Sequence, residues 1–140
     1  MLTLQTTEGV VAKIGGEYFK MDDVFEELKA IMVPITESLD VKHDDPGNYY
    51  VDTFHTMKNG KRLWFGGVQI KKNYVSYHLM PVYVNPELLT DISAGLKKRM
   101  QGKSCFNFKA VDRSLFDELE LLTQRSRQDY DSKGFLNDIK

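Results

Sequence analysis

The sequence predicts an α+β fold: an antiparallel sheet with helices packed on one face, which is a two-layer sandwich. Three observations lead to this prediction. Three strand-like runs follow one another between residues 49 and 84 with short turns between them, which is typical of an antiparallel meander. A further strand-like run comes later, at residues 105–109. Amphipathic helical patterns stand before and after these strands, and such helices bury their apolar stripe against a sheet.

The N-terminal third predicts a short extension followed by a helix. Residues 1–20 are weakly patterned, and we expect them to form an N-terminal extension or a short strand at residues 10–14. Asp22 is a natural N-cap for a helix with an apolar stripe at Phe25, Leu28, Met32, Ile35 and Leu39. Pro34 removes one backbone hydrogen bond and crowds the preceding turn, so we expect the helix to kink or divide there.

The central third predicts the three-strand meander. Each strand is preceded by residues that favour turns, at positions 44–48, 58–61 and 71–73. The strands themselves are expected at residues 49–56, 63–70 and 74–84. Gly66 and Gly67 stand inside the second strand, which indicates a bulge or a close approach of another backbone segment.

The last third predicts short helices, a returning strand and a long final helix. Asn85 and Ser93 are placed to cap two short helices, the second reaching Met100 and closed by Gly102. Strand alternation in residues 105–109 then puts Phe106 and Phe108 on one face and the polar residues on the other. Asp112 caps the final helix; we expect fraying after Arg127, with docking only at Phe135 and Leu136.

Composition indicates a single domain in a reducing compartment. A chain of 140 residues can bury roughly 68–70% of its unfolded surface, so residues 21–140 are expected to form one domain. Cys105 is the only cysteine, which excludes an internal disulfide. No apolar run approaches the ~20 residues of a membrane span, and no signal peptide is recognisable. We therefore expect a cytoplasmic protein with no membrane partner.

Two motifs resemble a known family. The run KNYVSYHLMP occupies Lys72–Pro81 and MQGKSCFNFK occupies Met100–Lys109. With the first helix and the DDPGNYY turn, these motifs resemble the YdhG-like family of small, mostly uncharacterised bacterial proteins over about residues 22–127. The resemblance carries no catalytic motif. Because some relatives have been likened to frataxin, it implies a non-enzymatic protein that binds or delivers iron.

An acidic cluster on the first helix is the candidate iron site. Its members are Asp22, Asp23, Glu26 and Glu27. Hard cations prefer carboxylate ligands, and Asp23 shares a helix face with the two glutamates. The simpler interpretation is that acidic residues favour the start of a helix electrostatically and stay solvated.

A second hypothesis places a small-ligand pocket or an uncharacterised enzyme site on the sheet. Ser76 and His78 point to the same side of their strand, and a neighbouring strand could bring further polar residues alongside. The candidate set is Ser76, His78, Tyr83, Lys103, Cys105 and Asn107. A structural hydrogen-bond network would use the same residues. A nucleophilic Cys105 needs a positive, partly exposed setting, and no cysteine-protease signature surrounds it.

Other interpretations are less well supported. The GKS tripeptide at residues 102–104 is no phosphate loop, because Lys97 stands where that motif requires glycine. The net charge of −1 argues against general nucleic-acid binding. A basic cluster could bind an anion or a nucleotide together with Tyr74, Tyr77, Tyr83 and Trp64, or could simply complement a helix end; it comprises Lys97, Lys98, Arg99, Lys103 and Lys109. A protein-interaction domain, including a homodimer formed through the sheet, is a third alternative.

Overall fold

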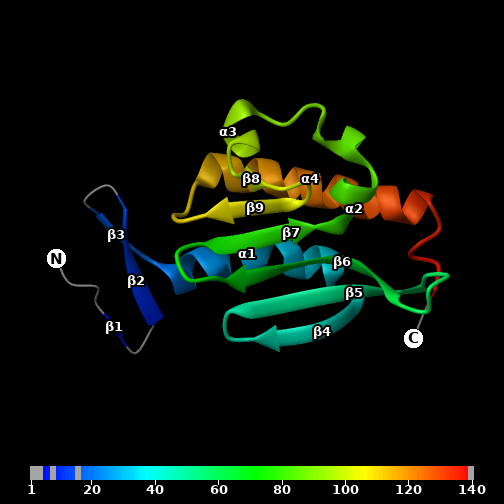
Figure 1. Ribbon diagram of the computed structural model, residues 1–140, viewed down its shortest axis with the longest axis horizontal. Helices are drawn as coiled ribbons and strands as arrows, with labels where there is room; N and C mark the ends of the chain where they lie inside the picture. The colour runs from blue at the N-terminus through cyan, green and yellow to red at the C-terminus, as the bar shows by residue number, and fades with distance from the viewer. Residues whose placement is uncertain (1–4, 7–8, 15–16, 139–140) are drawn as a thin grey trace.

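The computed structural model describes residues 5–6, 9–14 and 17–138, with side chains from Met21 onward. The remainder of the expected N-terminal extension lies outside the described residues. Three short strands of the N-terminal segment form a small antiparallel sheet in the order β1-β2-β3 (Figure 1), and their bounds are Gln5–Thr6, Gly9–Ile14 and Glu17–Lys20. The short strand expected at residues 10–14 falls within β2.

The main sheet has six antiparallel strands in the order β4-β5-β6-β7-β9-β8. Four of them follow one another as a meander: β4 (Asp40–Asp45), β5 (Asn48–Thr56), β6 (Arg62–Ile70) and β7 (Val75–Leu79). The chain then leaves the sheet and returns as β8 (Met100–Gln101) and β9 (Cys105–Phe108). Strand β9 pairs with β7, which joins the returning strands to the meander.

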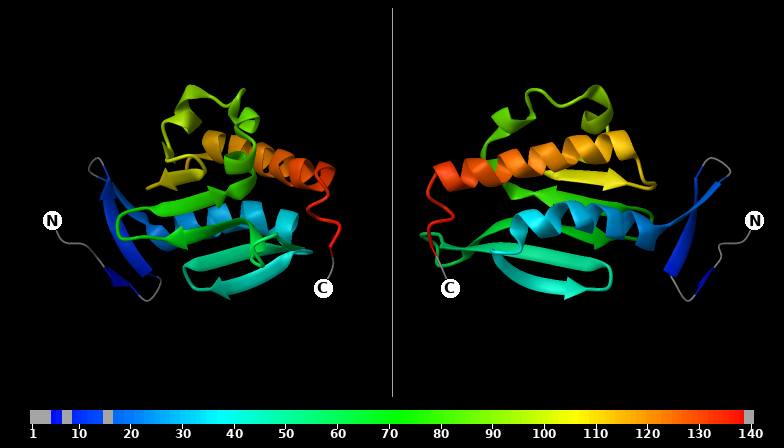
Figure 2. Two further views of the ribbon diagram at one scale, coloured as in Figure 1. Left: turned by 45° about the vertical axis from the view of Figure 1, so that its right-hand side comes forward. Right: turned by 180° about the vertical axis from the view of Figure 1, so that it is seen from behind.

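Two long helices cover one face of this sheet. They are α1 (Met21–Thr36) and α4 (Arg113–Ser132), and both lie behind the strands in Figure 1 and in front of them in the right-hand view of Figure 2. Three short segments link β7 to β8 and contact α4: α2 (Met80–Val84), η1 (Pro86–Leu89) and α3 (Ala94–Lys97). The fold is therefore the α+β two-layer arrangement that the sequence predicts, with helices on one face of an antiparallel sheet.

The core lies between the sheet and the two long helices. Its fully buried members come from both layers and include Phe25, Leu28, Phe65, Phe106 and Phe116. Two hydroxyls inside it are paired: the hydroxyl of Tyr77 lies 2.7 Å from that of Thr123, and the Thr123 hydroxyl also donates to the Leu119 carbonyl at 2.8 Å. Because a buried polar group without a partner is costly, these contacts fix how α4 sits on the sheet.

Three of the four predicted helix caps and the glycine pair agree with the sequence prediction, whereas Asp22 is not an N-cap because helix α1 already begins at Met21. The side chains of Asn85, Ser93 and Asp112 each accept a backbone amide hydrogen bond at a helix start. The register of β5 and β6 shifts beside Gly66, and a Cβ atom there would lie 2.2 Å from the backbone oxygen of His78. Strand β6, which the sequence predicted as the second strand of the meander, thus contains both a bulge and a close backbone approach.

Three predictions about the meander of the main sheet and about helix α1 are wrong. The meander has four strands, because residues 40–45 form β4; this run is polar, so it lacks the apolar alternation that marks a strand. Helix α1 is not divided at Pro34 but continues to Thr36, because the proline removes only one backbone hydrogen bond while the buried face of the helix is held against the core. The third strand ends at Leu79, and Pro81 lies in the first turn of α2, where its missing amide hydrogen is tolerated.

Two further corrections concern the C-terminal half. The second short helix ends at Lys97, and Met100 belongs to strand β8 because it pairs with Phe106. The final helix does not fray after Arg127 but continues to Ser132. Tyr130 is fully buried and donates a hydrogen bond to the Trp64 carbonyl at 2.9 Å, so the last turns of α4 are held by the sheet.

Candidate ligand-binding site

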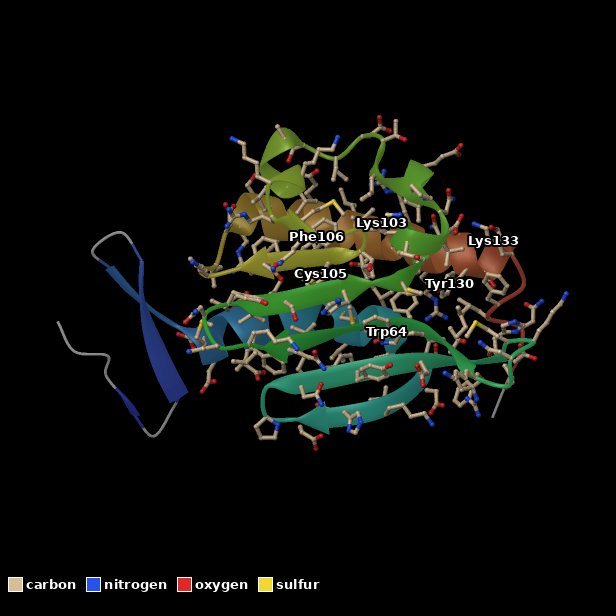
Figure 3. The ribbon with its side chains drawn as sticks, viewed as in Figure 1. Trp64, Lys103, Cys105, Phe106, Tyr130 and Lys133 are labelled. Carbon is tan, nitrogen blue, oxygen red and sulfur yellow. The ribbon has the colours of Figure 1, made fainter. Side chains whose placement is uncertain are left out.

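The face of the sheet turned away from α1 and α4 carries a polar and aromatic surface. Strand register brings two pairs of predicted residues side by side: Ser76 with Asn107 and His78 with Cys105. Side chains alternate along each strand, so all four point away from the buried Tyr77, Phe106 and Phe108. Figure 3 looks onto the sheet with the two long helices behind it, and in this view Trp64 and Cys105 both lie over the strands.

Three rings form a row across this face, which we call the ring row: Tyr50, Trp64 and His78. The rings of Tyr50 and Trp64 are stacked with centroids 5.2 Å apart and an interplanar angle of 15°. The Trp64 and His78 rings are 5.3 Å apart and tilted by 43°. Gly67 pairs with Tyr50 on one side and His78 on the other, so it adds no side chain between them and the indole occupies that space. The indole nitrogen donates to the Gly66 carbonyl at 3.0 Å, which fixes its orientation.

A chain of polar contacts continues from the ring row towards the β8 edge. The Cys105 sulfur lies 3.7 Å from Nε2 of His78, and the thiol donates to Oδ1 of Asn107 at 3.3 Å. Nδ2 of Asn107 in turn donates to Oε1 of Gln101 at 2.6 Å. His78, Cys105 and Asn107 of the predicted patch are therefore connected through their side chains, whereas the Ser76 hydroxyl donates to the Gln69 carbonyl at 3.4 Å.

The electrostatics of this set favour neutral groups. Burial, with a smaller contribution from the charge of Lys71, lowers the pKa of His78. Burial also raises the pKa of the Cys105 thiol. At neutral pH the pair is therefore a thiol beside an uncharged imidazole. A nucleophilic cysteine needs the opposite arrangement, which is a stabilised thiolate.

A depression of about 320 Å³ lies over these residues. Residues from five strands and the turn after β6 line it: Tyr50, Trp64, Gln69, Lys71, Tyr74, Ser76, His78, Gln101, Cys105 and Asn107. Its volume is near the lower end of the roughly 300–1,000 Å³ typical of small-molecule sites. Ring faces line one part of the depression and amide groups another, so a ligand here could both stack and form hydrogen bonds.

The structure separates two of the predicted residues from the others. Tyr83 belongs to α2 and is 52% exposed, and the Lys103 ammonium lies 5.9 Å from its ring centroid. Neither residue lines the depression. Sequence reasoning also missed Tyr50 as part of the site, and it considered Trp64 only together with the basic cluster. Alternation with the buried Tyr49 could have placed Tyr50 on this face, but the bulge beside Trp64 breaks the alternation in β6.

The acidic residues of α1 do not gather into a metal site. Within the described side chains, no three histidine, cysteine, aspartate or glutamate residues are placed to share an ion. Glu27 instead forms an ion pair with Arg113, at 2.8 Å between Oε1 and Nη2. Asp22, Asp23 and Glu26 lie on the partly or fully exposed side of the helix. Iron binding by these four residues stays a prediction that their placement does not favour.

Comparison with protein-family models, with curated proteins and with solved structures finds no match. The resemblance to the YdhG-like family therefore stays a prediction. Within the part of the chain that the structure describes, no helix combines the length and apolar character that a membrane span requires.

Proposed function

We propose that this protein is a binding protein that holds a small planar ligand on the open face of its sheet. The observation that carries the proposal is the ring row, which stands beside hydrogen-bonding side chains in one depression. No helix covers this face among the described residues, whereas the opposite face is buried under α1 and α4 (Figure 2).

The chemistry of the surface supports a planar ligand. Trp64 and Tyr50 are half-buried and fixed in a stacked pair, so a ligand ring can add to the row without ordering new side chains. Aromatic rings prefer offset-stacked or edge-to-face neighbours, and the tilted His78 ring offers one of these surfaces. Asn107 and Gln101 are already hydrogen-bonded to each other, and their remaining donors and acceptors are free to recognise polar atoms at a ligand edge.

Binding fits the electrostatics better than catalysis does. The candidate nucleophile Cys105 is held as a thiol and the candidate base His78 is poorly disposed to take up a proton, since burial disfavours the charged form of each. The same burial suits a site that must exclude water around a bound ring.

Tryptophan fluorescence provides a direct test, because Trp64 is the only tryptophan in the chain. We expect adenosine, nicotinamide or riboflavin to change Trp64 emission in a saturable way. Replacing Tyr50 by alanine should weaken that binding at least about fivefold, since one stacking partner contributes about 1–3 kcal/mol. The matched control is Tyr83→Ala, which removes an exposed tyrosine outside the depression and should leave affinity unchanged.

Circular dichroism and urea unfolding establish that both variants keep the fold. The proposal is wrong if none of the three probes gives a saturable signal by fluorescence and by calorimetry. It is also wrong if Tyr50→Ala and Tyr83→Ala reduce affinity equally, because the probe would then bind outside the ring row.

A further inference from the structure

A second depression of about 350 Å³ adjoins the ring-row site and is basic. Its lining residues are Tyr74, Lys98, Arg99, Met100, Gln101, Asn107 and Lys109. Three of them, Tyr74, Gln101 and Asn107, also line the first depression, so the two form a continuous surface. We call the second one the basic depression.

Positive charge in this region is not balanced by acidic side chains. None of the residues that line either depression is an aspartate or a glutamate. Lys98, Arg99 and Lys109 form no ion pair with a described carboxylate, and neither does Lys71 in the first depression. The whole chain carries nearly equal numbers of acidic and basic residues, so four cations without an acidic partner among the described side chains are a local excess.

The helix dipole does not account for this arrangement. Lys98 and Arg99 follow α3, which spans only the four residues Ala94–Lys97. A single turn has a weak dipole, so it explains little of a basic run that continues past its end. The backbone amide of Asn107 instead donates to the Arg99 carbonyl at 2.8 Å, which holds Arg99 beside strand β9. Arg99 is therefore anchored next to the ring-row site by a long-range contact.

We infer that the ligand bound by the ring row also carries a phosphate or a comparably compact anion, which the basic depression holds. A mononucleotide has this chemistry: a planar base on Tyr50, Trp64 and His78, and a phosphate facing Lys98, Arg99 and Lys109. The inference rests on the proposed function. Arginine binds phosphate in a bidentate manner and lysine adds point charge, so the two residue types suit this role.

A mononucleotide fits better than a nucleic-acid strand. The basic residues cluster at one end of the ring row, whereas single-strand binding uses a charged groove that follows the backbone over many nucleotides. The net charge of −1 also gives no general attraction to a polyanion.

The test compares adenosine with adenosine 5′-monophosphate, using Trp64 fluorescence and calorimetry. We expect the nucleotide to bind roughly tenfold or more tightly than the nucleoside at low ionic strength, because hydrogen bonds to charged groups are the stronger ones. Added salt should reduce this advantage, since the basic side chains are exposed to solvent. The variant Arg99→Gln should remove most of the advantage and leave adenosine affinity unchanged.

The control is Lys97→Gln, because Lys97 belongs to the same basic run but lines neither depression. Equal affinity for nucleoside and nucleotide would overturn the inference and leave the proposed function standing. The inference would also be overturned if Lys97→Gln and Arg99→Gln reduced the affinity advantage of the nucleotide equally, since a general electrostatic field would then be responsible for it. Much tighter binding of a short single-stranded oligonucleotide would favour nucleic acid instead. If neither adenosine nor its monophosphate binds, the inference fails, and the proposed function fails with it only if nicotinamide and riboflavin do not bind either.

Discussion

Replacing Gly66 by alanine should disrupt the pairing of β6 and β7. Gly66 has no positive φ angle, so an L-residue can adopt its backbone conformation and the effect is purely steric. A Cβ atom would lie 2.2 Å from the His78 carbonyl oxygen and 3.3 Å from Cε of Met32. The side chain of Met32 can move, but the His78 carbonyl belongs to the strand backbone and cannot move without displacing β7.

The expected loss of stability follows from that displacement. Overpacking a filled region costs about 1–3 kcal/mol. Separating the strands also weakens about two backbone hydrogen bonds, each with a net contribution of about 1 kcal/mol. We therefore expect the Gly66→Ala variant to lose about 3–5 kcal/mol, a large part of the roughly 5–15 kcal/mol that stabilises a domain of this size.

Urea unfolding, followed by Trp64 fluorescence and far-UV circular dichroism, measures this loss as a lower midpoint. Gly95→Ala is the matched control, because its Cβ atom would meet only side-chain atoms, the flexible end of Leu115 at 3.3 Å and Oγ of Ser93 at 3.8 Å. Gly95 lies in helix α3, where alanine is favoured by up to about 1 kcal/mol, so its midpoint should change little or rise. A loss below about 1 kcal/mol for Gly66→Ala, with an unchanged slope, would refute the steric reasoning.

Two further predictions concern buried groups. Replacing Tyr77 by phenylalanine leaves the Thr123 hydroxyl without its tyrosine partner and should cost about 1–3 kcal/mol, measured by urea unfolding; a change of only a few tenths would contradict that pairing. Cys105 should react with iodoacetamide more slowly in the folded than in the urea-unfolded chain at neutral pH. Burial raises the pKa of the thiol, so less thiolate is present, and the rate should rise only above the pH at which an ordinary cysteine ionises. Mass spectrometry of the alkylated chain gives the alkylation rates of the folded and the unfolded chain. If the rate in the folded chain rose at a lower pH than in the unfolded chain, this prediction would be contradicted.

Much of the fold could be predicted from local patterns in the sequence. The apolar stripe of α1 and the capping side chains of Asn85, Ser93 and Asp112 act on residues three or four positions away, so they can be read without knowing the tertiary structure. The two-residue period of strands likewise placed His78 opposite to Tyr77.

Features that depend on distant neighbours could not be predicted in this way. Nothing local shows that β7 pairs with β9, so the contact between His78 and Cys105 was conditional on that pairing. Trp64 joins the site because a bulge turns it towards Tyr50, and a bulge depends on both strands. Residues 80–84 contain valine and tyrosine, which favour strands, but Pro81 cannot donate a ladder hydrogen bond and the segment is helical.

The two outermost strands of the main sheet limit how copies of this chain can associate. Strand β4 has the sequence DVKHDD and is exposed along nearly all of its length, and like charges on a second copy would meet there. At the other border, β8 has only two residues. Short or charged border strands are poor templates for adding a further strand. Neither border of the main sheet therefore favours a continuous sheet between molecules, which leaves the faces of this sheet as its more suitable surfaces for association.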